Sequence, residues 1–105
     1  IIKLKEPVEL TNSNILPNYT FSAQRRDIDI NKHMHNIYYL DYALEALPQE
    51  IYDNLNCNEF EIMYKSGIKF LDKINCFYSK QDSSYFIIMK NAENNKLNAI
   101  IKFTV

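Results

Sequence analysis

Regular alternation of apolar and polar residues in the second half of the chain is the feature that most restricts its fold. Successive side chains of a strand point to opposite faces, so a period of two predicts half-buried strands. Such alternation occurs in four runs, at residues 60–70, 74–78, 85–89 and 97–105. The breaks between the runs, at residues 71–72, 81–84 and 91–96, are short enough for antiparallel hairpins. Asn94 and Asn95 in the last break suit a left-handed turn conformation.

A single long helix is predicted ahead of these strands. Between Asn36 and Leu47 the apolar residues recur at spacings of three and four, which is typical of an amphipathic helix. They are Ile37, Leu40, Leu44 and Leu47. Pro48 ends this helix, because the residue before a proline avoids the helical conformation. The same proline suits the first turn of a short second helix through Ile51 and Tyr52.

A first strand is predicted from Tyr19 to Arg26, with Tyr19, Phe21 and Ala23 on one face. One strand, one long helix and four further strands predict an α+β fold in which the helix packs on an antiparallel sheet of about five strands. A single layer of this kind leaves strand edges and a face open. We therefore expect it to pair with a second copy or with a sister domain.

Composition and charge indicate an ordered globular protein and exclude some classes of partner. The 105 residues fit one domain, and 47% of them are hydrophobic. A net charge of −1 gives no overall attraction to nucleic acid, and no stretch approaches the roughly 20 apolar residues of a membrane span. Residues 1–18 are predicted to form a linker and residues 19–105 the folded domain. Because the chain begins with Ile1 rather than Met, we expect a piece of a longer polypeptide.

Cys57 and Cys76 are the two cysteines of the sequence. Two thiols do not make a disulfide framework, so reduced cysteines in a cytoplasmic protein are the simpler interpretation. Neither has the spacing to other Cys or His residues that metal ligands show, so no metal site is predicted. Neither has an activating base nearby in the sequence, which argues against a catalytic thiol.

A polar motif directly before the helix is where we expect the chemistry. Residues 27–36 read Asp-Ile-Asp-Ile-Asn-Lys-His-Met-His-Asn. If this segment is extended, the side chains of Asp29, Asn31 and His33 share one face. The start of a helix offers unpaired N–H groups and the positive end of the helix dipole, which favour a developing oxyanion. A carboxylate, an amide and an imidazole at such a place suit acyl transfer to water.

Each motif residue also has a simpler structural interpretation. Asp29 belongs to a residue type that often caps a helix or forms a turn, and Asn31 is a common turn residue. His33 fits a surface imidazole or a hydrogen-bonded core histidine as well as it fits a catalytic one. Asn36 is most simply the N-cap of the helix. Asp27 is expected to orient or cap the loop rather than to react.

The motif resembles that of the hotdog-fold thioesterases, and most closely the C-terminal half of the acyl-acyl carrier protein (acyl-ACP) thioesterases. The matching residues are Asp27, Asp29, Asn31, His33, Asn36, Tyr39, Leu40, Glu45 and Pro48. The resemblance extends over most of the chain after about residue 18. It implies a hotdog fold and hydrolysis of fatty acyl thioesters, a reaction of fatty acid biosynthesis that releases free fatty acid.

The resemblance also implies a role for each site residue. Asp29 would attack the thioester carbonyl or direct water at it, and the sequence leaves both open. Asn31 would hold substrate or water, and His33 would supply a hydrogen bond or transfer a proton. N–H groups near Asn36 would stabilise the oxyanion, while Tyr39 would contact substrate or serve in packing. Neither a metal ion nor an organic cofactor is implied.

The implied substrate is an acyl carrier protein thioester, with a coenzyme A (CoA) thioester as the alternative. Acyl carrier proteins are acidic, so a basic surface would dock one. The candidate docking residues are Arg25, Arg26, Lys65 and Lys69. The implied pairing partner is a preceding hotdog domain in a double-hotdog protein, or a second copy in a homodimer. The active site would lie near that pairing surface.

Three positions depart from the family's pattern. Gly67 stands where the family usually carries a glutamate, in a Tyr-x-x-Glu strand that begins here at Tyr64. His35 replaces the first of two adjacent asparagines, and Ile68 stands where plant members carry a cysteine. Loss of a catalytic or orienting carboxylate can lower the rate by several powers of ten. Gly67 therefore favours an alternative function, a catalytically weak or silent hotdog module that binds an acyl chain or completes a dimer.

Overall fold

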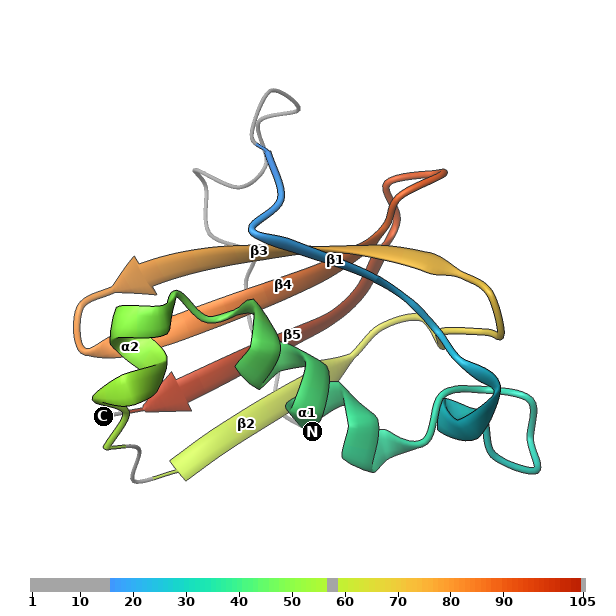
Figure 1. The fold of residues 1–105 in the computed structure, drawn as a ribbon, viewed down its shortest axis with the longest axis horizontal. Coiled ribbons are helices and arrows are strands. Elements are labelled where there is room, and N and C mark those ends of the chain that lie inside the picture. Colours follow the sequence, from blue (N-terminus) through green and yellow to red (C-terminus); the bar gives the residue numbers. More distant parts are fainter. Residues whose placement is uncertain (1–15, 57–58, 105) are drawn as a thin grey trace.

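The computed structural model describes residues 16–56 and 59–104, which form a helical layer on one face of a sheet (Figure 1). The strands are β1 (Tyr19–Ser22), β2 (Glu59–Tyr64), β3 (Lys73–Gln81), β4 (Ser84–Asn91) and β5 (Leu97–Thr104). The helices are the short 3₁₀ turn η2 (Arg25–Asp27), α1 (Asn36–Ala46) and α2 (Gln49–Asp53). Cys57 and all but the last three residues of the predicted linker lie outside the described residues.

The five strands form one antiparallel sheet in the order β1-β3-β4-β5-β2. The hairpins β3–β4 and β4–β5 make its centre, while β1 and β2 lie at its two edges. Figure 1 shows α1 in front of the sheet, with α2 at the C-terminal end of α1. The predicted α+β fold, with one long helix on a sheet of five strands, is confirmed.

The hairpin expected at residues 71–72 is wrong. β2 ends at Tyr64, because the N–H groups of the next two residues both donate to the carbonyl of Asn98, at 2.8 and 3.1 Å. Residues 65–72 then cross to the far side of the sheet, where β3 pairs with β1 instead of β2. The alternation continues beyond the strand because Ile68, although in a loop, is fully buried in the core.

Two other predicted elements are shorter than expected or differ by one residue. The first strand ends at Ser22 rather than at Arg26, because the chain turns into η2. Pro48 is the N-cap of α2 rather than a residue of its first turn. In the last hairpin Asn95 has a φ of 61°, which confirms its left-handed conformation. The same prediction for Asn94 is wrong, because Asn94 has no positive φ; its side chain instead accepts from the Lys96 N–H at 2.9 Å.

Helix α1 packs on the sheet through one aromatic and two small residues. Its buried side chains are Tyr39, Ala43 and Ala46. The prediction that Ile37 belongs to the buried face is wrong, since its side chain is 60% exposed, and Leu40 and Leu44 are half-buried against the core. The buried positions also have spacings of four and three, so two helical patterns overlap in this sequence. The alanine pattern faces the sheet because short side chains let the two backbones approach closely.

The sheet contributes buried apolar side chains on both of its faces. Those packed in the cluster with α1 are Ile74, Cys76, Ile87, Met89, Ala99, Ile101 and Phe103. A smaller cluster contains Phe77, Ile88 and Ile100. Burial raises the pKa of the Cys76 thiol to about 12, so this cysteine is a core group held in its neutral form. Within the described part of the chain, no helix has the length and apolar character needed to cross a membrane.

The contrast between Ile87 and Ile37 gives a test of this packing. Ile87→Ala leaves a cavity in a fully buried cluster and should lower the free energy of unfolding by about 2–5 kcal/mol. Ile37→Ala shortens a side chain that is 60% exposed and should change the free energy of unfolding by less than about 0.5 kcal/mol. Urea unfolding followed by circular dichroism measures both. Equal losses in the two variants would contradict the helix face described above.

Candidate active site

The motif before α1 forms a closed loop rather than an extended segment. Its ends are joined by a bridge between Ile28 and Met34, and the His35 N–H donates to the Asp27 carbonyl at 2.8 Å. Inside it the Asp29 N–H donates to the His33 carbonyl at 2.9 Å. The expectation that alternate side chains share one strand face is therefore wrong. The loop nevertheless brings Asp29 and His33 together at its neck.

Asp29 shapes this loop through its carboxylate. Oδ1 accepts hydrogen bonds from the N–H of Asn31 at 2.8 Å and from the N–H of His33 at 3.4 Å. This is the turn-forming role that aspartate commonly takes. The side chain is half-buried and lines a surface hollow of about 310 Å³ with Arg25, Ile28, Lys32 and Phe70. The structure thus holds the carboxylate in place at an accessible hollow that two cationic side chains also line.

Asn31 and His33 are both exposed, on the loop's tip and neck. Asn31 contacts Asp29 through its backbone N–H. The imidazole of His33 lies against Gly67, in the loop that follows β2. That loop is joined to the motif by the Met34 N–H, which donates to the Ile68 carbonyl at 2.7 Å. Sequence reasoning placed these residues near one another but missed the contact between His33 and Gly67.

His35, not Asn36, is the N-cap of α1. Its Nδ1 accepts a hydrogen bond from the Ile37 N–H at 3.2 Å, and its backbone is extended. The prediction of an Asn36 cap fails because an imidazole nitrogen one residue earlier serves as the acceptor. Asn36 is the first residue of the helix and lines a second hollow, of about 400 Å³, with side chains of α1 and β2. The other lining residues are Ile37, Leu40, Asp41, Phe60, Ile62 and Tyr64.

Tyr39 lies beneath the loop, in the core. Its hydroxyl accepts from the Ile68 N–H at 3.4 Å, and its ring meets that of Tyr64 edge-on, with centroids 5.0 Å apart. Burial raises the pKa of the Tyr39 hydroxyl, and the negative charge of Asp29 adds to the shift. These contacts show that Tyr39 packs in the core, and its contact with substrate stays a prediction.

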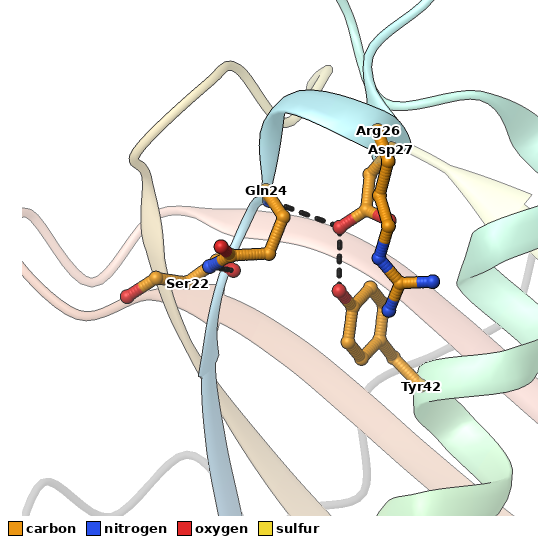
Figure 2. A network of polar contacts seen from close by, with 5 residues as sticks. All are labelled: Ser22, Gln24, Arg26, Asp27 and Tyr42. Atoms are coloured by element: carbon orange, nitrogen blue, oxygen red, sulfur yellow. Dashed lines mark hydrogen bonds and ion pairs between the residues drawn. The ribbon is translucent and has the colours of Figure 1, made fainter.

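Asp27 anchors the loop to the helix (Figure 2). Its fully buried side chain accepts from the Tyr42 hydroxyl at 2.5 Å and from the Gln24 N–H at 3.0 Å, both at Oδ2. Arg26 Nε lies 3.8 Å from the other oxygen, Oδ1. Burial and the bond to Asp27 raise the pKa of Tyr42 to about 12, and the Tyr42 ring stacks on that of Phe21 with centroids 3.8 Å apart. The prediction that Asp27 orients or caps the loop is confirmed.

Comparison with known proteins identifies the family of this chain. The model of the acyl-ACP thioesterase C-terminal domain matches residues 11–104. The chain belongs to this family. The structure of an acyl-ACP thioesterase from Bacteroides thetaiotaomicron is 25% identical, with a TM-score of 0.75, over 98% of this chain and 42% of that one. The 12:0-ACP thioesterase from Umbellularia californica is 17% identical, with a TM-score of 0.73, over 99% of this chain and 39% of that one.

Curated plant proteins are also similar to this chain. The chloroplastic oleoyl-acyl carrier protein thioesterase 1 of Arabidopsis thaliana is 31% identical over 65 residues, which are 62% of this chain and 16% of that protein. The chloroplastic dodecanoyl-[acyl-carrier-protein] hydrolase of Cinnamomum camphora is 32% identical over 66 residues, 60% of this chain and 17% of the relative. The chain thus spans about a sixth of the curated relatives it matches. The hotdog-type fold is confirmed, and the roles of the site residues stay predictions.

Tyr42→Phe tests whether the buried bond to Asp27 stabilises this domain. The variant keeps the ring that stacks on Phe21 and loses one hydrogen bond to a buried carboxylate, so it should lose about 1.5–3 kcal/mol of unfolding free energy. Unfolded tyrosine ionises near pH 10.0 and Tyr42 near 12, so the wild-type advantage should fade as the pH rises between these values.

Tyr52→Phe is the matched control, because its ring is exposed and carries the same hydroxyl. It should change the free energy of unfolding by less than about 0.5 kcal/mol. Denaturant titrations at several pH values measure all three proteins. Equal stability of wild type and Tyr42→Phe at neutral pH would contradict the anchoring role.

Proposed function

We propose that this chain carries the reacting groups of a thioester hydrolase that acts on fatty acyl thioesters, with acyl carrier protein as the carrier. The observation that carries the proposal is the closed loop before α1, which holds the Asp29 carboxylate at a surface hollow and His33 beside it. Membership of the acyl-ACP thioesterase C-terminal domain family supports the same reaction class. A role in fatty acid biosynthesis is part of the proposal.

In the proposed reaction the oxygen of water ends on the thioester carbonyl carbon and the carbon–sulfur bond breaks. In one alternative Asp29 attacks the carbonyl carbon and expels the thiolate, and water then hydrolyses the resulting anhydride to free Asp29; in the other, Asp29 removes a proton from the attacking water. In both, the leaving thiolate takes up a proton. His33 supplies a hydrogen bond or that proton, and Asn31 at the loop tip holds substrate or water. The His35 cap occupies the Ile37 N–H, so the N–H of Asn36 is the candidate oxyanion donor at the helix start.

The carrier is proposed from charge. Arg25 and Lys32 line the same hollow as Asp29, and Lys69 lies in the neighbouring loop before Phe70. Cationic side chains around the entrance favour an acidic carrier protein and the phosphate of its prosthetic group. A CoA thioester presents phosphates as well and is the second candidate. One structural neighbour, a Staphylococcus aureus protein with a TM-score of 0.71 over 82% of this chain and 71% of that one, 19% identical, was solved in complex with CoA.

The proposed pairing surface is the hollow between α1 and β2. Its apolar side chains are markedly exposed for their size, with Ile37 at 60%, Phe60 at 51% and Tyr64 at 47%. Exposed apolar groups beside an edge strand suit a contact with another domain. A preceding hotdog domain, or a second copy of this chain, is the proposed partner.

A cytoplasmic location also stays a proposal, since the curated plant relatives are named as chloroplastic.

Hydrolysis assays with two carriers test the proposed substrate. Release of fatty acid from acyl-ACP and acyl-CoA of several chain lengths is measured with this chain, alone and joined to the proposed preceding hotdog domain. We expect turnover of acyl-ACP, with a KM that rises several-fold on adding salt, because docking of an acidic protein is screened. The KM for acyl-CoA should rise less. Absence of turnover at every length with both carriers would favour the silent module that Gly67 suggests.

Asp29→Asn tests the reacting carboxylate. Asparagine keeps an Oδ1 that can accept from the N–H groups of Asn31 and His33, so the loop should keep its shape. Loss of the negative charge should lower kcat by about 100-fold or more. Asp82→Asn is the control, because Asp82 lies in an exposed turn with a φ of 54°, which asparagine tolerates. An unchanged kcat in Asp29→Asn would remove Asp29 from the mechanism.

A further inference from the structure

Gly67 is the single glycine of the sequence, and the imidazole of His33 packs against its backbone. A Cβ atom on residue 67 would be 2.6 Å from Cδ2 of that ring, 3.2 Å from Cγ and 3.3 Å from Nε2. Carbon atoms in van der Waals contact are about 3.5–4.0 Å apart. Any side chain at position 67 therefore excludes the observed position of His33.

Hydrogen bonds hold the backbone on both sides of Gly67. On one side the Ser66 carbonyl accepts from Asn98 Nδ2 at 3.0 Å, and the Ser66 N–H donates to the Asn98 carbonyl at 3.1 Å. On the other side Ile68 is fully buried, and its carbonyl accepts from the Met34 N–H at 2.7 Å. Space, rather than an unusual φ, is what position 67 requires.

The backbone of His33 is fixed as well. Its carbonyl accepts from the Asp29 N–H at 2.9 Å, and its N–H donates to Asp29 Oδ1 at 3.4 Å. The next residue, Met34, is buried and bonded to Ile68. A side chain at position 67 would thus be relieved mainly by rotating the imidazole away, into solvent and into another orientation relative to Asp29.

We infer that Gly67 is a positioning residue: its lack of a side chain leaves room for the imidazole of His33, whose backbone is hydrogen-bonded to Asp29. The catalytic part of the inference rests on the proposed function. The contact between the His33 ring and Gly67 is independent of that function. It gives the glycine a different meaning from the one that the sequence suggested. A glutamate at position 67 and the present place of His33 exclude each other, because every side chain begins with the same Cβ. The glycine belongs to an arrangement in which Asp29 and His33 act with no side chain from position 67.

Nuclear magnetic resonance tests the contact between the His33 ring and Gly67 without any need for turnover. The sequence contains two histidines, His33 and His35, so their ring protons are readily assigned. The wild type should show a nuclear Overhauser effect between the His33 ring and the Gly67 α-protons. Gly67→Ala should shift the His33 ring signals and leave those of His35 in place. Ser66→Ala, a substitution one residue earlier that keeps both backbone bonds to Asn98, should shift neither.

Kinetics of a double-mutant cycle test the consequence for catalysis. Gly67→Ala should lower kcat by about 10- to 100-fold with KM within about twofold, as expected for a misplaced reacting group. In the His33→Ala background the ring is gone, so Gly67→Ala should have no further effect. Gly67→Glu should also lower kcat in the wild-type background.

Several outcomes would overturn the inference. They are an absent contact between His33 and Gly67 in the wild type, unchanged His33 signals in Gly67→Ala, the same fall in kcat with and without His33, and a rise in kcat in Gly67→Glu. If no variant hydrolyses a thioester, the resonance data alone show whether Gly67 positions the His33 ring. In that case the proposed function fails, and the positioning of His33 is judged separately.

Discussion

The buried carboxylate of Asp27 is the constraint on which the site depends. One oxygen binds Tyr42 of α1 and the Gln24 N–H, while the carbonyl of the same residue accepts from His35 at the start of the helix. A buried carboxylate without partners is costly, so these donors must stay in place whenever the domain is folded. The strand that precedes the motif and the helix that follows it are thereby held at a fixed separation. The loop between them has little freedom left.

A second segment, residues 65–72, also contributes to the site, although it lies far from the motif in the sequence. It leaves β2 because Asn98 takes its first two N–H groups, and it enters the core through Ile68. The bonds of Met34 and Tyr39 to Ile68 then join the motif loop and the helix to this segment. His33 rests on its glycine as a result. Two loops that are more than thirty residues apart in the chain share one small surface because the sheet order places them together.

Residues of the same type differ in burial and in hydrogen bonding within this arrangement. Asp27 is fully buried and bonded, whereas Asp29 is half-buried, shapes its own loop and opens on a hollow. Tyr39 and Tyr42 are held by packing and hydrogen bonds inside the domain, and His35 is used as a helix cap. Asp29, at a hollow, and His33, which is exposed, have hydrogen-bonded backbones, which agrees with the reacting roles proposed for them. Membership of the acyl-ACP thioesterase C-terminal domain family agrees with this proposal.

The sequence by itself determined the α+β class, the order of its elements and the segment that carries the candidate chemistry, because these follow from local periodicity and a short motif. It also indicated the structural role of Asp27. The tertiary structure decided the closed shape of the motif loop, the His35 cap, the alanine face of α1 and the pairing of β2 with β5. Only the tertiary structure shows why position 67 lacks room for a side chain, because the ring of His33 occupies that space. These features depend on contacts between residues distant in the chain, and local periodicity holds no information about such contacts.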